Sequence, residues 1–144
     1  MSDARIVIIT PPPINILSPI TEGIRDDEFE KLNEEEREHS GYRTYMSKKR
    51  YADRIMELAA RYEETGRVMG LDFWGSIVRA RLREIGVNYD EQNLPGSGLY
   101  GVEDFGKGYF TDGLHLDKKG YNVLSNALYD EMLSKWPELA PERL

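Results

Sequence analysis

The residues best suited to acid–base chemistry are an aspartate and a histidine three positions apart. Asp112 and His115 lie in the sequence Thr-Asp-Gly-Leu-His-Leu, which follows a glycine-rich stretch. The glycine between them lets the carboxylate fold back onto Nδ1 of the imidazole. Such a contact fixes the tautomer and leaves Nε2 free to act as a general base. The spacing makes Asp112 and His115 the candidate catalytic pair.

The same spacing has a structural interpretation, because short Asp-x-x-His sequences are common. Asp112 would then cap the following turn, and His115 would be a half-buried structural histidine. The other histidine, His39, follows a run of acids and is expected to be exposed. A metal site is the weakest alternative because the carboxylates are scattered and lack ligand spacing. No cofactor is expected.

No serine lies in a nucleophile sequence. None follows Gly-Asp, and the serines are Ser2, Ser18, Ser40, Ser47, Ser76, Ser97, Ser125 and Ser134. Gly96-Ser97-Gly98 lacks the strand–turn–helix setting of a nucleophile elbow, so we interpret it as a flexible loop.

Two apolar runs predict the strands that must position the pair. Ile6–Ile9 is β-branched and ends at three prolines, a pattern typical of a strand buried on both faces of a parallel sheet. Val68–Phe73 predicts a second short strand. Residues 87–110 are rich in glycine and predict a long irregular segment. The acidic segment Asp26–Glu38 is expected to be a solvated helix or loop, the alternative being an acidic docking surface.

Helical periodicity predicts the remaining elements. A helix within 42–65, capped by Gly66, would bury one stripe, and a helix over 75–85 would end at Gly86. A last helix would begin after Asp117 as N-cap. The expected apolar face of the first helix is Tyr51, Ile55, Leu58, Ala59 and Tyr62, and that of the last is Val123, Leu124, Ala127, Leu128 and Met132. Strands and helices in this order indicate an α/β protein with two visible parallel strands and about four helices.

Several of these sequences resemble one enzyme family. Asp112-Gly113-Leu114-His115-Leu116, with Lys119-Gly120-Tyr121 after it, resembles the last signature block of the SGNH (GDSL) hydrolases. The stretch from Ile6 to Pro13 is similar to a strand and turn of the isoamyl acetate-hydrolysing esterases in that family. Leu71-Asp72-Phe73-Trp74 resembles their last core strand, and Phe110-Thr111 leads into the histidine block. The resemblance runs from about Arg5 to Trp136.

The resemblance implies a fold and an activity. The chain, residues 1–144, would be a single partial domain, the C-terminal part of a flavodoxin-like three-layer α/β/α SGNH fold. Asp112 and His115 would be the acid and base of a serine triad in a carboxylic ester hydrolase acting on small esters. The Gly-Asp-Ser block and the Gly-x-Asn-Asp block that supply the nucleophile and oxyanion hole of the family have no counterpart here. We therefore expect a truncated form that keeps two of the three triad residues.

Composition excludes other classes of function. The 144 residues carry 19 bases and 26 acids, a net charge of −7, which argues against nucleic acid or an anionic membrane as partner. No apolar run approaches the ~18 residues of a membrane span. The absence of a signal-peptide pattern favours a cytoplasmic protein, and the absence of cysteine excludes disulfides.

Two hypotheses remain open from the sequence. The first is the truncated esterase; the second is a non-hydrolytic descendant that serves as a binding module or a His115-based acid–base catalyst. In either case the resemblance places a missing strand beside Arg5–Thr10. An apolar strand edge without a neighbour is a template for association. We expect the chain to self-associate through that edge or to remain partly molten until a partner covers it.

Overall fold

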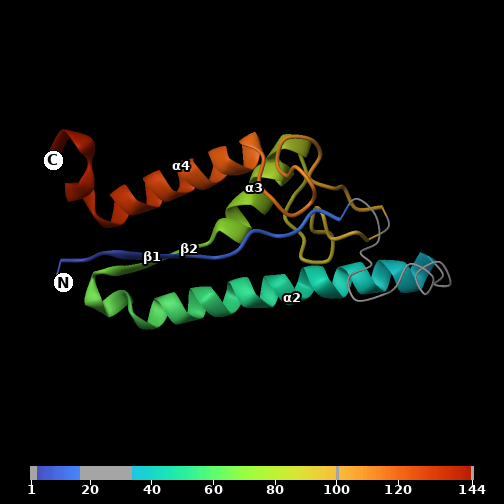
Figure 1. Ribbon diagram of the computed structural model, residues 1–144, viewed down its shortest axis with the longest axis horizontal. Coiled ribbons are helices and arrows are strands. Elements are labelled where there is room, and N and C mark those ends of the chain that lie inside the picture. The colour runs from blue at the N-terminus through green and yellow to red at the C-terminus, as the bar shows by residue number, and fades with distance from the viewer. Residues whose placement is uncertain (1–2, 17–33, 100, 144) are drawn as a thin grey trace.

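The computed structural model describes residues 3–16, 34–99 and 101–143 (Figure 1). The described strands and α-helices are β1 (Ile6–Ile9), α2 (Glu34–Arg61), β2 (Val68–Leu71), α3 (Phe73–Ile85) and α4 (Lys118–Lys135). Three short 3-10 helices are η1 (Glu63–Thr65), η2 (Pro137–Leu139) and η3 (Pro141–Arg143). The prediction of a mixed α/β chain with two parallel strands is confirmed, with three α-helices in the described part rather than about four. Residues 26–33 of the acidic segment lie outside the described residues.

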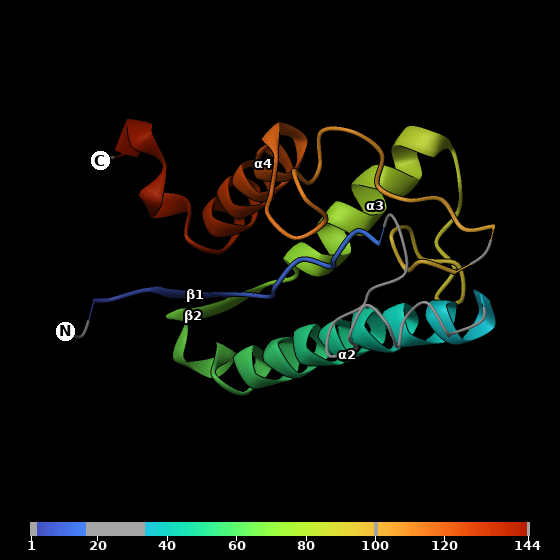
Figure 2. The same ribbon diagram turned by 45° about the vertical axis from the view of Figure 1, so that its right-hand side comes forward.

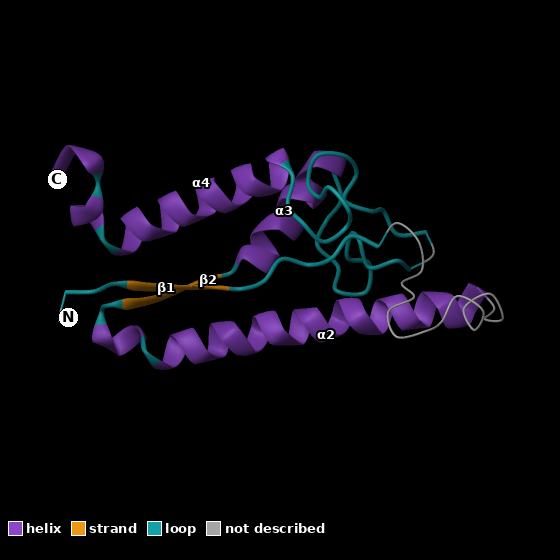
Figure 3. Cartoon of the chain, viewed as in Figure 1, coloured by secondary structure: helices purple, strands orange, loops and turns teal. Residues whose placement is uncertain are grey.

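The sheet consists of β1 and β2 in parallel, with Ile6 opposite Val68 and Ile9 opposite Leu71. It lies between α2 on one face and α3 with α4 on the other (Figures 1 and 3). Figure 2 shows the same three layers after rotation. No helix in the described part of the chain is long and apolar enough to cross a membrane.

The two strands differ in burial. Val68, Met69 and Leu71 are buried, whereas Ile6 is 53% and Ile9 39% exposed. The prediction that Ile6–Ile9 is buried on both faces is therefore wrong. The reason is the position of the helices: α2 and α4 pack mainly on β2, so the ends of β1 are not covered.

Helix α2 approaches the sheet closely through small side chains. A Cβ on Gly70 would lie 2.8 Å from the Cβ of Ala59 and 3.1 Å from the sulfur of Met56. Ala52 and Ala59 are accordingly buried, with Tyr45 further toward the helix N-terminus. The face of α2 that contains Ala52 and Ala59 is therefore the one that packs on the sheet.

The stripe predicted for this helix is largely on another face. Ala59 is buried and Ile55 is half-buried, but Tyr51 is 68%, Leu58 43% and Tyr62 50% exposed. The prediction failed because a two-stranded sheet contacts a narrow band of the helix, and the smaller residues occupy it. Gly66 adopts the expected left-handed conformation, and it closes η1 rather than α2 itself.

The boundary between β2 and α3 also differs from the prediction. The strand ends at Leu71, and Asp72 caps α3 by accepting a hydrogen bond from the N–H of Gly75 at 2.9 Å. Phe73, assigned from the sequence to the strand, begins the helix. Gly86 terminates α3 in the left-handed conformation, and Asp117 caps α4, both as predicted.

Beyond the carboxyl ends of the strands, the core is built from aromatic residues and irregular chain. Tyr45 of α2 donates a hydrogen bond to the Pro95 carbonyl at 2.9 Å and meets the Trp74 ring edge-on at 5.7 Å. Phe105 is fully buried against Phe110. The irregular segment predicted for 87–110 is thus exposed over residues 87–93, and its later part contributes residues 94–97, 105, 109 and 110 to the core.

The contact between α2 and β2 can be tested by substitution. We expect Gly70→Ala to lower the free energy of unfolding by about 1–3 kcal/mol, because the added methyl overpacks a close helix–sheet contact. Urea denaturation of the variant and the parent measures this loss.

The double variant Gly70→Ala/Ala59→Gly is the control. Ala59→Gly alone costs about 1 kcal/mol through helix propensity. In the double variant the space left by Ala59 should recover part of the Gly70→Ala loss, so the two losses should not add. Fully additive losses would contradict the contact.

Candidate active site

The candidate pair is formed within one turn. Oδ2 of Asp112 lies 2.5 Å from Nδ1 of His115. The other carboxylate oxygen, Oδ1, accepts hydrogen bonds from the N–H groups of Leu114 at 2.9 Å and His115 at 2.7 Å. Both oxygens are therefore engaged, and the imidazole is held in one orientation relative to its own backbone.

A hairpin-like loop presents this turn. Phe110 and Leu116 form an antiparallel bridge, and the N–H of Thr111 donates to the His115 carbonyl at 2.9 Å. At the turn itself Gly113 has φ of 83°, a conformation that side chains other than glycine rarely adopt. The glycine between Asp112 and His115 thus serves the function that the sequence suggested.

The segment after β1 anchors the loop. The N–H of Asn15 donates to the Gly113 carbonyl at 2.8 Å, and a Cβ on Gly113 would lie 2.6 Å from the Asn15 carbonyl oxygen. The Asn15 side chain is buried and accepts a hydrogen bond from the Phe105 N–H at 2.9 Å. Asn15 thus connects β1 to the irregular segment and to the loop that carries Asp112 and His115, hereafter the dyad.

A second set of contacts fixes the other end of the loop. Glu84 of α3 accepts hydrogen bonds from the Tyr109 hydroxyl and the Lys119 ammonium, each at 2.6 Å. The Lys119 side chain lowers the pKa of Glu84, with a further contribution from Tyr109. Burial and the bond to Glu84 raise the pKa of Tyr109 to about 12. These groups tie α3 to the start of α4 directly after His115.

The dyad faces solvent. The His115 side chain is 72% exposed and that of Asp112 is 52% exposed. The N–H of His115 lowers the pKa of Asp112 most, followed by the His115 side chain and the N–H of Leu114. The carboxylate is thus ionised at neutral pH, and it holds the proton of neutral His115 on Nδ1. Nε2 is then an acceptor, and it has no hydrogen-bond partner among the described residues.

Ser97 is not placed to serve as the nucleophile. It is fully buried, its N–H donates to the Leu94 carbonyl at 3.3 Å, and its hydroxyl has no hydrogen-bond partner among the described residues. The neighbouring Gly96 exchanges backbone bonds with Ile16 and Glu103. Because Ser97 is buried and the backbone of Gly96 and Ser97 is hydrogen-bonded, the structure does not support the interpretation of this stretch as a flexible loop.

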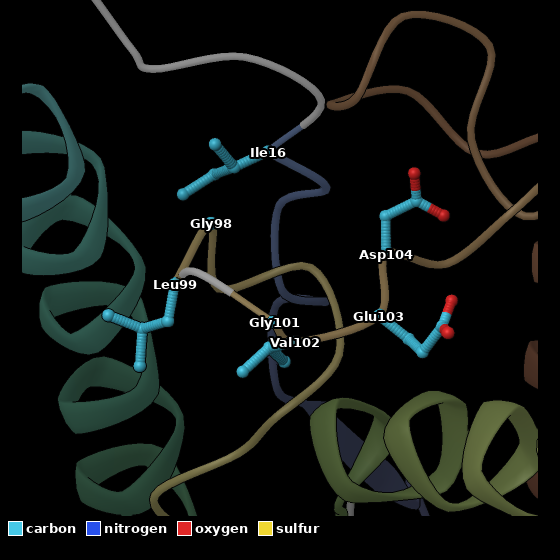
Figure 4. A pocket seen from close by; sticks show the side chains of 7 residues that line it. All are labelled: Ile16, Gly98, Leu99, Gly101, Val102, Glu103 and Asp104. Carbon is cyan, nitrogen blue, oxygen red and sulfur yellow. The ribbon is translucent and has the colours of Figure 1, made fainter. Parts of the chain in front are cut away.

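A hollow of about 420 Å³ lies beside this stretch. Figure 4 shows Leu99 and Val102 on one side and the carboxylates of Glu103 and Asp104 on the other. Asp112 and His115 do not line it. His39 lies in α2, in the part whose side chains are outside the described ones.

Comparison of the chain with protein-family models, with curated proteins and with solved structures finds no match in any of the three. The resemblance to SGNH hydrolases therefore depends on the sequence blocks themselves, and the dyad geometry is an observation independent of it.

Sequence reasoning found the dyad but missed the residues that hold it. Asp112, Gly113 and His115 signal their turn locally, through an Asp-Gly pair. Asn15 gives no such signal, because its partners are more than 80 positions away in the chain. Glu84 lies on a helix as an ordinary acid, and only the fold brings it to Tyr109.

Gly113→Ala tests the anchoring of the loop. The new methyl would meet the Asn15 carbonyl in a backbone conformation that alanine disfavours, so we expect the loop to shift and the His115 ring resonances to move. The decrease in the free energy of unfolding should exceed the cost of placing alanine in a left-handed conformation, which is about 1–2 kcal/mol. NMR of the imidazole and urea denaturation report both effects.

Gly101→Ala is the matched control. Gly101 has φ of 76°, but an added Cβ would meet no described residue within 4 Å. It should show only the conformational cost and leave the His115 resonances unchanged. Equal effects of the two substitutions would contradict the role of the Asn15 contact.

The lowered pKa of Asp112 predicts a pH dependence. The carboxylate contacts should be intact above the ordinary aspartate value of 3.8 and be lost only as the pH falls through the lower folded value. The stabilisation they give the folded chain therefore decreases in acid, not in base. Amide chemical shifts of Leu114 and His115 across an acid titration measure this. In Asp112→Asn the same shifts should be insensitive to that titration.

Proposed function

We propose that the chain is the Asp–His part of an SGNH-type carboxylic ester hydrolase acting on small esters. The observation that carries the proposal is the 2.5 Å contact between Asp112 and Nδ1 of His115, with the imidazole exposed. A base held in this way is suited to deprotonate a hydroxyl that belongs to another segment and approaches the exposed Nε2 atom. The SGNH-like block around Asp112 and the similarity of Ile6 to Pro13 support the family and its flavodoxin-like fold.

In this proposal His115 acts first as a base. The hydroxyl of a serine in a complementing Gly-Asp-Ser segment attacks the ester carbonyl, and Nε2 of His115 takes the hydroxyl proton. Asp112 stabilises the resulting imidazolium and keeps its tautomer. The imidazolium then returns the proton to the departing alkoxide, so an alcohol leaves and an acyl-serine remains.

The second half of the reaction, hydrolysis of the acyl-serine, uses the same groups in the reverse order. Nε2 takes a proton from water as the water oxygen attacks the acyl-serine, and the serine oxygen recovers a proton as the acid leaves. The complementing segment also has to supply oxyanion donors, each of which is worth about 10²–10³ in rate. The dyad alone lacks both the nucleophile and these donors.

The exposure of the dyad also favours a second candidate. With its Nε2 unbonded among the described residues, His115 could take or give a proton without a covalent intermediate. The chain would then be a non-hydrolytic descendant, either an acid–base catalyst or a binding module. Complementation with a serine segment distinguishes the two.

The chain alone should be unreactive toward serine-directed probes. We expect no stoichiometric labelling by a fluorophosphonate and negligible turnover of short-chain p-nitrophenyl esters, because Ser97 is buried and no described serine is bonded to His115. Mass spectrometry of the treated protein checks this. Stoichiometric labelling of one serine in this chain would contradict the proposal that the nucleophile comes from another segment.

Complementation should create an activity that depends on the dyad. When the N-terminal half of an SGNH esterase is fused or added, hydrolysis of short-chain p-nitrophenyl esters should appear. His115→Ala should remove nearly all of it. Asp112→Asn should reduce kcat by about 10⁴, the loss that follows from the wrong tautomer in a serine protease.

Lys118→Ala is a suitable control because Lys118 is exposed and close in sequence to the dyad. It should leave the activity unchanged. Activity that survives His115→Ala would contradict the proposal, as would a complemented protein that binds the second half but shows no labelled serine.

A further inference from the structure

The outer edge of β1 carries backbone groups ready to pair. The N–H of Ile6 donates to the Arg67 carbonyl and that of Thr10 to the Leu71 carbonyl, at 2.7 and 3.0 Å. Because backbone direction alternates along a strand, the N–H and C=O groups of Val7 and Ile9 point the other way. No described strand lies on that side.

Helix α2 carries an apolar stripe that is largely exposed. Tyr51, Ile55, Leu58 and Tyr62 follow one another at intervals of four, three and four residues, which places them on one face. Three of them are among the exposed large hydrophobic residues of the chain. The stripe lies about 90° around the helix from Ala52 and Ala59, which face the sheet.

The stripe and the strand edge belong to one flank. In a right-handed β–α–β crossover, the form that nearly all such units take, the stripe side of α2 is the side of β1. The two also lie at the same height. Ile8 is opposite Gly70, which packs against Met56 and Ala59, and the centre of the stripe falls between Ile55 and Leu58.

The ends of the stripe carry opposite charges. Lys48, Lys49 and Arg50 directly precede Tyr51, and Glu63 and Glu64 directly follow Tyr62. Two such stripes placed antiparallel bring the bases of each against the acids of the other. Placed parallel, they would bring like charges together.

We infer that this flank is the interface between two copies of the chain, related by a two-fold axis through Ile8. Val7 of each copy forms a hydrogen-bonded antiparallel pair with the partner's Ile9, which uses every outward backbone group of the strand. The sheet becomes four-stranded. On its α2 face, Tyr51 packs near the partner's Tyr62 and Ile55 near the partner's Leu58.

Strand and helix spacings agree with this arrangement. A two-fold axis beside β1 places the two β1 strands about 4.8 Å apart and the two β2 strands about 14 Å apart. Each α2 helix contacts both strands of its own copy, so the two helices lie about 10 Å apart. Packed helices lie about 8–10 Å apart. The two α2 helices can thus touch while the strands pair, and the contact is closed, as an isologous two-fold contact must be.

The dimer adds no residue to the proposed site, although it uses the β1 edge that a complementing segment would also pair with. Asp112 and His115 lie beyond the carboxyl end of β1, so antiparallel strands place the two dyads at opposite ends of the sheet. Neither copy supplies a residue to the site of the other.

Light scattering coupled to size exclusion tests the interface with the full chain. We expect twice the 16.6 kDa of one chain, and we expect Leu58→Glu and Tyr62→Glu to give monomers that keep a cooperative thermal transition. Tyr129→Glu is the control: Tyr129 of α4 is 52% exposed, like Tyr62, but lies off this flank. A parent that is monomeric at every concentration, open-ended oligomers, or a Leu58→Glu dimer would overturn the inference.

A charge exchange tests the antiparallel order. Lys48→Glu/Arg50→Glu makes both ends of the stripe acidic, and Glu63→Lys/Glu64→Lys makes both ends basic. Each variant alone should dimerise at least tenfold more weakly than the parent at low salt, and an equimolar mixture should recover the dimer. A mixture that stays as weak as its components would overturn the pairing of these ends.

Discussion

The hydrogen bond from the Asn15 N–H to the Gly113 carbonyl is the contact on which the candidate site depends. It connects the first strand of the chain to a loop near its end, and the Asn15 side chain extends the connection to Phe105. Three prolines before it restrict the backbone between β1 and this residue. The position of the dyad loop relative to the sheet is therefore fixed by the segment that follows β1. Helix α4 begins after the dyad, at Lys118. The backbone N–H and the buried side chain of Asn15 are bonded to two other segments, and such buried polar groups are costly to leave unpaired, which makes the arrangement specific.

The mismatch between helix and strand lengths explains much of the remaining architecture. Helix α2 has 28 residues and is about 42 Å long, whereas each strand has four residues and covers about 13 Å. The N-terminal part of the helix extends past the sheet and needs another surface. The irregular segment provides it through the Tyr45–Pro95 bond, and Leu94 and Phe105 of that segment belong to the same buried cluster as Tyr45. A loop that fills this role is buried, so its glycines allow close approach rather than mobility.

What could be predicted from the sequence was local. The caps at Asp117 and Gly86 and the Asp112 turn depend on residues within a few positions of one another, and they were correctly placed. Burial depends on residues far along the chain, and there the predictions for Ile6–Ile9 and for the first helical stripe failed, whereas the predicted face of α4 is half-buried. The stripe from Tyr51 to Tyr62 has ideal helical spacing, yet of its members the narrow sheet buries only Ala59, together with Ala52 from outside the stripe. Ser97 and Asn15 are similar cases, since their surroundings come from segments that periodicity does not relate.

Exposure decides what the dyad can do. A general base contributes about 10²–10⁴ to a rate when the group it deprotonates is positioned beside it. Among the described residues no group is bonded to Nε2 of His115, whose side chain is exposed. Excluding water from it requires a further surface at the carboxyl end of β1. The SGNH resemblance places a complementing strand on the same β1 edge that the two-fold dimer uses. A second copy and a complementing segment would then compete for Val7 and Ile9, and only the latter brings a hydroxyl toward His115. The assembly state of the β1 edge would therefore control whether a well-oriented base meets a nucleophile.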